Sequence, residues 1–133
     1  MARLHDVVFD CHRPSALARF WAGALDGYDV APYDDAEIER LRGIGIDDIE
    51  DDPSVLVESP GTVPRFFFQL VPESKTVKNR VHLDLRCDDV EVETARLVAL
   101  GARVLPATGP SNDWVVLADP EGNEFCLAGP QPL

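Results

Sequence analysis

The chain has 133 residues, of which 45% are hydrophobic, so it can bury the core of one domain but is too short for two domains of ordinary size. Its formal net charge is −12, concentrated between residues 29 and 58, which repels phosphate backbones and disfavours nucleic acid as a partner. No apolar run approaches membrane-spanning length, and three scattered cysteines without a CxxC pair fit reduced thiols in a cytoplasmic protein.

The first half of the chain predicts one strand, one helix and three further strands. Residues 4–11 are an apolar, β-branched run typical of a strand. Pro14 suits the first turn of a helix, and the apolar residues that follow it recur at helical spacing. These are Leu17, Phe20, Trp21, Ala24 and Leu25. Strand-like runs follow at residues 28–33, 54–58 and 65–71.

The second half repeats this order. Residues 80–87 alternate as a strand, with His82, Asp84 and Arg86 on one face. A helix over residues 90–101 follows, and we expect a capping box of Asp88 and Glu91 to begin it.

The chain then ends in three short strands. The first spans residues 103–105, and the other two, 114–118 and 123–127, pair across a turn at residues 120–122.

The spacing of matching residues indicates an internal duplication. Cys11 and Cys87, which end the first strands of the two halves, lie 76 residues apart, whereas Gln69 and Cys126, in the last strands, lie 57 apart. The difference of 19 residues equals the length of the acidic segment 34–52, which carries a predicted short helix at 36–42. We therefore predict a single domain over residues 1–133. Its first module covers about 1–73 with 34–52 inserted, and its second covers about 79–129.

This pattern resembles the vicinal oxygen chelate superfamily, which includes glyoxalase I, bleomycin-resistance proteins and extradiol dioxygenases. The resemblance rests on the duplicated βαβββ order and on LARFWAGALDG at 17–27, VHLDL at 81–85 and DPEGN at 119–123. FQLVPE at 68–73, KNRVHLD at 78–84 and GNEFC at 122–126 look like the bacterial glyoxalase-like domain group. The resemblance implies an α+β fold, with two tandem modules forming a cupped mixed sheet, helices outside and a cleft within. It also implies a homodimer.

In metal-dependent relatives the ligands lie on the first and last strands of each module. Strand parity and the register of the repeat assign these positions to Asp6, Gln69, His82 and Cys126. The resemblance implies that these four residues are ligands of a divalent metal ion. Cys126 lies seven residues after Asp119 of the turn, at the usual ligand position of the superfamily.

Two residues beside these positions offer another ligand set. A one-residue shift in the first strand would exchange Asp6 for His5. His5, His82 and Glu124 would then form a two-histidine, one-carboxylate triad for ferrous iron.

The alternative to a metal site is a metal-free cleft that binds a small molecule. Its predicted lining residues are Phe67, Gln69, His82, Trp114 and Cys126. The basic stretch 75–80 is either a solvated connector or an anion-attracting rim of this cleft.

Three functions remain open at this point. The first is a metal-assisted lyase, isomerase or dioxygenase in which Glu124 moves a proton. The second is metal-free acid–base catalysis by His82, Asp6 or Glu124. The third is sequestration of a small molecule, as in bleomycin-resistance proteins, and a cationic drug would suit the acidic surface.

Overall fold

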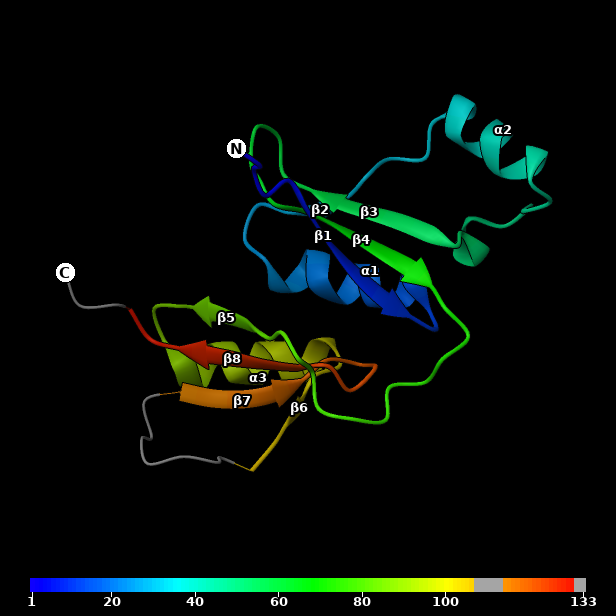
Figure 1. The fold of residues 1–133 in the computed structure, drawn as a ribbon. Coiled ribbons are helices and arrows are strands. Elements are labelled where there is room, and N and C mark those ends of the chain that lie inside the picture. Colours follow the sequence, from blue (N-terminus) through cyan, green and yellow to red (C-terminus); the bar gives the residue numbers. More distant parts are fainter. Residues whose placement is uncertain (107–113, 131–133) are drawn as a thin grey trace. The chain divides into compact units, whose positions relative to one another are not determined.

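The computed structural model describes residues 1–106 and 114–130. The chain divides into two compact units, unit 1 (Met1–Ser74) and unit 2 (Lys75–Leu133). Each unit holds one four-stranded mixed sheet and one long helix that follows the first strand (Figure 1). The predicted α+β class and its two βαβββ modules are therefore confirmed.

In unit 1 the strands lie in the order β1-β4-β3-β2, and β1 runs parallel to β4. The elements are β1 (Asp6–Cys11), α1 (Pro14–Ala24), β2 (Asp29–Val30), β3 (Ser54–Glu58) and β4 (Arg65–Leu70). The segment predicted as an insertion forms α2 (Asp35–Gly43) and the 3-10 turn η1 (Ile49–Asp51) between β2 and β3. The side chain of Asp34 caps α2 by accepting a hydrogen bond from the Glu37 backbone.

Helix α1 packs its predicted apolar stripe against β2, β3 and β4. Pro14 begins the helix, where its missing N–H costs nothing, and Gly27 follows its end with a φ of +76° that glycine adopts without strain. Trp21, the largest fully buried side chain, meets the ring of Phe9 edge-on at a centroid distance of 5.4 Å. The predicted periodicity therefore describes the buried face correctly for the helix itself, whereas Leu25 lies just past the helix end and is half-buried.

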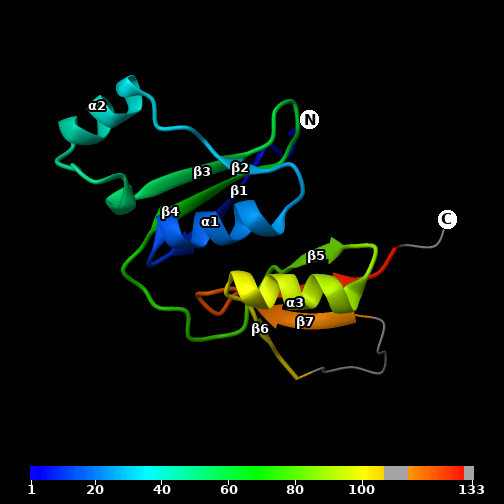
Figure 2. The same cartoon turned by 180° about the vertical axis from the view of Figure 1, so that it is seen from behind.

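In unit 2 the strand order is β5-β8-β7-β6, with β5 parallel to β8. The elements are β5 (Leu83–Arg86), α3 (Val90–Leu100), β6 (Arg103–Val104), β7 (Trp114–Ala118) and β8 (Glu124–Ala128). Figure 2 shows α3 lying across one face of this sheet. The fully buried side chains of the unit come from this helix and from β7 and β8. The largest of them are Leu97, Leu117, Phe125 and Leu127.

Two local predictions in unit 2 need correction. The helix cap is Asp89, whose carboxylate accepts a hydrogen bond from the Val92 backbone at 3.1 Å, and not Asp88. In addition, β5 begins only at Leu83, so His82 lies just before the strand. Val81, which the predicted alternation would place on the face opposite His82, is 76% exposed.

The turn between β7 and β8 is organised by a buried carboxylate. Asp119 accepts hydrogen bonds from the backbone of Glu121 (2.9 Å) and of Asn123 (3.0 Å), and from the Asn123 side chain (2.9 Å). Gly122 supplies the φ of +90° that the turn requires. These bonds fix where β8 begins and so decide which of its side chains lie on each face.

Side chains alternate between the two faces of both sheets. In β8, Phe125 and Leu127 are buried whereas Glu124 and Cys126 are only half-buried, which places the second pair on the face away from the core. Each sheet thus leaves one face open to function. Among the described residues, no helix is long and apolar enough to span a membrane.

Candidate functional site

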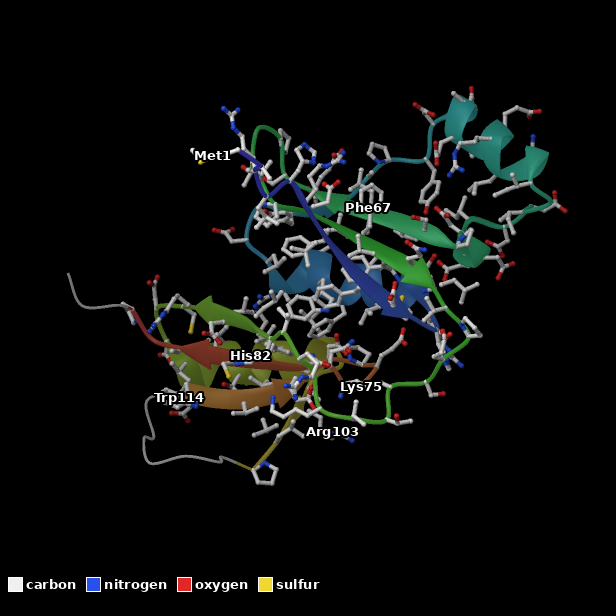
Figure 3. The ribbon with its side chains drawn as sticks, in the orientation of Figure 1. Met1, Phe67, Lys75, His82, Arg103 and Trp114 are labelled. Atoms are coloured by element: carbon white, nitrogen blue, oxygen red, sulfur yellow. The ribbon has the colours of Figure 1, made fainter. Side chains whose placement is uncertain are left out.

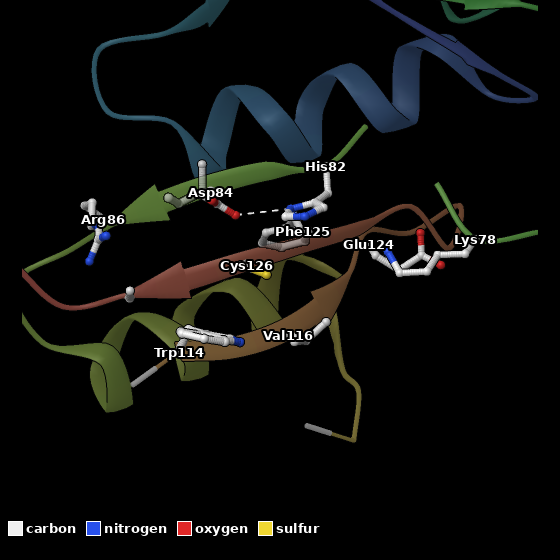
Figure 4. A pocket seen from close by; sticks show the side chains of 11 residues that line it. Lys78, His82, Asp84, Arg86, Trp114, Val116, Glu124, Phe125 and Cys126 are labelled. Atoms are coloured by element: carbon white, nitrogen blue, oxygen red, sulfur yellow. Dashed lines mark ion pairs between the residues drawn. The ribbon is translucent and has the colours of Figure 1, made fainter. Parts of the chain in front are cut away.

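A cavity of about 330 Å³ lies over unit 2, on the side chains that β5, β7 and β8 direct away from the core (Figure 4). It is lined by Lys78, His82, Asp84, Leu85, Arg86, Trp114, Val116, Glu124, Phe125, Cys126 and Ala128. Its size is within the range of small-molecule sites in proteins. Three predicted ligand-binding residues therefore share one cavity.

The chemistry of this cavity centres on three side chains. His82, Asp84 and Cys126 each offer one donor atom, and these atoms lie within 4.8 Å of one another. His82 Nδ1 is 3.1 Å from Asp84 Oδ1, as the dashed line in Figure 4 shows. The strand register explains the proximity, because Asp84 and Cys126 are direct partners in the parallel pair β5·β8. We call this group the His–Asp–Cys cluster.

The thiol in the cluster is not activated by its surroundings. Burial raises the pKa of Cys126, and the negative charge and hydrogen bond of Asp84 raise it further, against a smaller lowering by Lys78. Cys126 therefore keeps its proton at neutral pH and is a poor nucleophile. A cation bound to the sulfur would reverse this effect.

One wall of the cavity is apolar and aromatic. Trp114 and Val116 come from β7, and Figure 3 shows His82 and Trp114 over the sheet of unit 2. The Trp114 side chain is 39% exposed, which is unusual for so large an apolar group and makes it available for a ligand. This wall offers stacking surface beside the polar cluster.

Glu124, the predicted acid–base group, lines the same cavity, and its carboxylate accepts hydrogen bonds from residues at the start of unit 2. Its Oε1 accepts a hydrogen bond from Lys75 Nζ (3.1 Å), and its Oε2 accepts one from the Asn79 backbone (3.1 Å). Burial raises the pKa of Glu124, but these hydrogen bonds and the charge of Lys75 outweigh it, so the net shift is downward. The contacts hold residues 75–79 against β8.

The remaining predicted ligand residues lie in unit 1. Asp6 receives two hydrogen bonds from Arg65, at 2.8 and 3.2 Å, and a third contact from His5 Nδ1 at 2.8 Å. The Arg65 hydrogen bond is the main reason why the pKa of Asp6 is lowered. Gln69 lies exposed on β4 as the strand partner of Asp10. Any metal ion at Asp6 would have to displace the Arg65 guanidinium.

Phe67 lines a different cavity, within unit 1. This cavity of about 400 Å³ lies between the open face of β3 and β4 and the segment that carries α2. Tyr33 donates a hydrogen bond to the buried carboxylate of Asp52 (2.7 Å), and burial raises the pKa of Tyr33. The guanidinium of Arg65 lies over the Phe67 ring at 5.3 Å.

Of the residues that line the unit 2 cavity, sequence reasoning named His82, Trp114, Glu124 and Cys126 and offered the stretch that contains Lys78 as a rim, but it did not name Asp84 as a site residue. Asp84 could have been found, because it shares strand parity with His82 and lies two residues away. Its role depends on lying beside Cys126, and that pairing is set only by the register of β5 and β8.

The fold is of the vicinal oxygen chelate type, with two four-stranded βαβββ units. Residues 6–128 match the family described as "Glyoxalase-like domain", so the chain belongs to this family.

Solved structures with the same fold include three informative ones. A glyoxalase/bleomycin resistance protein/dioxygenase family enzyme from Burkholderia phytofirmans is 17% identical, with a TM-score of 0.65 over 96% of this chain and 98% of that one. The fosfomycin resistance protein FosX from Listeria monocytogenes is 11% identical, with a TM-score of 0.65 over 98% and 93%.

A point mutant of this FosX protein, complexed with Mn(II) and 1S,2S-dihydroxypropylphosphonic acid, gives a TM-score of 0.63 at 11% identity, over 96% of this chain and 89% of that one. No curated protein sequence matches the chain significantly.

Proposed function

We propose that the cavity of unit 2 binds a small oxygen-bearing molecule and that a divalent metal ion held there assists a lyase, isomerase or dioxygenase reaction. The observation that carries the proposal is the convergence of His82 and Cys126, two of the predicted ligand residues, in one cavity beside Asp84. The Mn(II) complex of the FosX relative supports a metal-assisted reaction on this fold.

The side chains of the cavity fit a metal ion chemically. Imidazole nitrogen, carboxylate oxygen and thiolate sulfur are the three donor types of protein-bound Zn²⁺ and related ions. Such an ion, when bound, polarises a substrate oxygen and stabilises the negative charge that develops on it. Since Asp6 is paired with Arg65, the proposal takes only His82 and Cys126 from the predicted ligand set.

The residues around the cluster have separable roles in this proposal. Trp114 and Val116 bind the apolar part of the ligand and exclude water. Lys78, on the rim, attracts an anionic group of the ligand. Glu124 positions residues 75–79, including Lys78, through its contacts with Lys75 and Asn79.

Metal-independent sequestration is the second candidate, and the Trp114 wall is the observation that favours it. An exposed indole ring beside Val116 can stack on a flat ligand without help from a metal ion. In that case His82 and Asp84 only donate or accept hydrogen bonds.

The test measures thermal stabilisation by dicarbonyls, catechols and cationic antibiotics, with the protein metal-free and metal-loaded. A ligand at about 100 times its Kd stabilises the folded state by about 2.7 kcal/mol. We expect metal to bind and to strengthen ligand binding. His82→Ala removes a direct ligand, so it should weaken metal affinity by more than the roughly 10- to 100-fold that loss of an outer-shell partner costs. His5→Ala in unit 1 is the matched control and should leave metal affinity unchanged.

Turnover separates the two candidates. Turnover by metal-loaded protein that a chelator abolishes supports the enzyme, and ligand binding that ignores both metal and His82→Ala supports sequestration. If neither metal nor any ligand raises the melting temperature, the cavity has no such function.

A further inference from the structure

We infer that unit 2 alone carries a three-ligand site for a zinc-like divalent ion, with His82, Asp84 and Cys126 as the ligands. The inference rests on the proposed function in that the ion lies in the same cavity. It adds Asp84, which the sequence did not suggest as a ligand, and it states which ions the site prefers. It also requires no ligand from unit 1.

The geometry of the cluster meets the needs of a tetrahedral ion. With ligand bonds of about 2.0–2.3 Å, the donor atoms around such an ion lie about 3.3–3.8 Å apart. His82 Nδ1 and Asp84 Oδ1 are slightly closer than this, at 3.1 Å, and all three donor atoms lie within 4.8 Å of one another. Small side-chain rotations therefore suffice to form the site.

The backbone holds two of the three ligands in place. Asp84 and Cys126 are directly paired in neighbouring parallel strands, so the hydrogen bonds of the sheet fix the distance between them. His82 lies just before β5 and reaches Asp84 with its ring (Figure 4). Its position outside the strand lets the ring turn to offer either nitrogen.

The donor types select the ion. Thiolate and imidazole favour Zn²⁺ and chemically similar ions, whereas Mg²⁺ and Mn²⁺ favour sites built of oxygen ligands. Coordination replaces the S–H bond of Cys126 by a sulfur–metal bond and releases the proton to solvent. The ionised Cys126 and Asp84 then supply two negative charges to match the dication.

The environment leaves room for a fourth ligand. Catalytic zinc sites combine three protein ligands with one open position for water or substrate. The cluster lines an open cavity, with Trp114 on one side and Lys78 on the rim, so a substrate oxygen can reach the ion. Arg86 donates a hydrogen bond to the Gly129 carbonyl oxygen at 3.1 Å, which ties down its guanidinium.

The experiment is a titration of metal-free full-length protein with Co²⁺, a spectroscopic substitute for Zn²⁺. We expect a near-ultraviolet thiolate-to-cobalt charge-transfer band in the wild type, absent from Cys126→Ser and retained in Cys87→Ser. Zn²⁺ should abolish the band, and equal concentrations of Mg²⁺ or Mn²⁺ should not. Asp84→Asn should weaken Co²⁺ affinity by about tenfold or more.

The matched control for Asp84 is Asp10→Asn. Asp10 pairs with Gln69 in unit 1 as Asp84 pairs with Cys126 in unit 2, so this variant should leave Co²⁺ affinity unchanged. Asp84→Asn and Cys126→Ser are nearly isosteric, and their melting temperatures in the absence of metal verify that they fold.

Three results would overturn the inference: no charge-transfer band in the wild type, an undiminished band in Cys126→Ser, or undiminished affinity in Asp84→Asn. Thermal stabilisation of the protein by the small molecules is measured on the same metal-free samples. If it persists without the cobalt band, the metal site fails while the cavity stands as a metal-independent binding site. If both are absent, the proposed function fails as well.

Discussion

The two units share a backbone plan but differ in the side chains on their open faces. In both, the first and last strands run parallel, and an aspartate of the first strand pairs with a residue of the last, Asp10 with Gln69 and Asp84 with Cys126. Among the described residues, only in unit 2 do a histidine and a thiol surround that aspartate. The fold therefore provides equivalent backbone positions in both units, and the side chains at those positions decide which unit can bind or react with a ligand.

The open face of unit 1 satisfies its own charges. Arg65 binds Asp6 and lies over Phe67, so these groups stabilise one another and need no ligand. In unit 2 the position that corresponds to Phe67 is Glu124, which binds the residues leading into β5. Each open face thus lines a cavity, but among the described residues only the face of unit 2 carries the His–Asp–Cys cluster.

The core-facing sides of the two sheets should contribute similarly to stability, and substitutions there should give the largest loss of stability. Phe68→Ala in β4 and Phe125→Ala in β8 each remove a fully buried ring, so each should lower the free energy of unfolding by about 3–5 kcal/mol. Urea denaturation followed by circular dichroism measures this loss. Phe67→Ala, on the open face of β4, is the control and should cost clearly less. Equal losses for Phe67→Ala and Phe68→Ala would contradict the strand register.

Glu124→Gln gives an intermediate effect and separates a stabilising role from a catalytic one. Its carboxylate accepts hydrogen bonds from Lys75 and from the Asn79 backbone in partly buried surroundings, so the variant should lose about 1.5 kcal/mol of stability. The exposed Glu73→Gln in unit 1 should lose almost nothing. A large fall in turnover at unchanged stability would instead make Glu124 the proton carrier.

The smallest effect is expected from Asp6→Asn in unit 1. Arg65 holds the pKa of Asp6 below its ordinary value of 3.8, so the ion pair contributes its full stability above that value and loses it as the pH falls through the folded-state pKa. The variant should melt slightly below the wild type at about pH 6, and the difference should shrink towards about pH 2. A difference that grows on acidification would show that the carboxylate is not the stabilising group.

Periodicity explains why most elements could be predicted. The 3.6-residue stripe of α1 and the two-residue alternation of β8 are local properties, and Pro14, Gly27 and Gly122 mark where the chain begins a helix or turns. The helix cap was misassigned by one residue because Asp88 and Asp89 are chemically equal candidates. The bonding of the Val92 backbone distinguishes them only once the loop is folded.

The site was harder to predict because its contacts join distant residues. Asp84 and Cys126 are 42 positions apart, and Asp6 and Arg65 are 59 apart. Strand parity shows which face each residue occupies, but it does not show which residue of another strand lies beside it. Gln69 and Asp6 stay predictions as ligands, as does the homodimer.

The sequence alone determined the α+β class, the duplicated modules and the face on which His82, Glu124 and Cys126 lie, because these follow from local patterns of hydrophobicity and turn residues. Its motifs indicated the family by resemblance. The tertiary structure decided which side chains meet. It paired Asp6 with Arg65, engaged Glu124 with Lys75 and brought Asp84 to Cys126 and His82. Those contacts depend on the register between strands, which is set by packing and hydrogen bonding across the whole sheet.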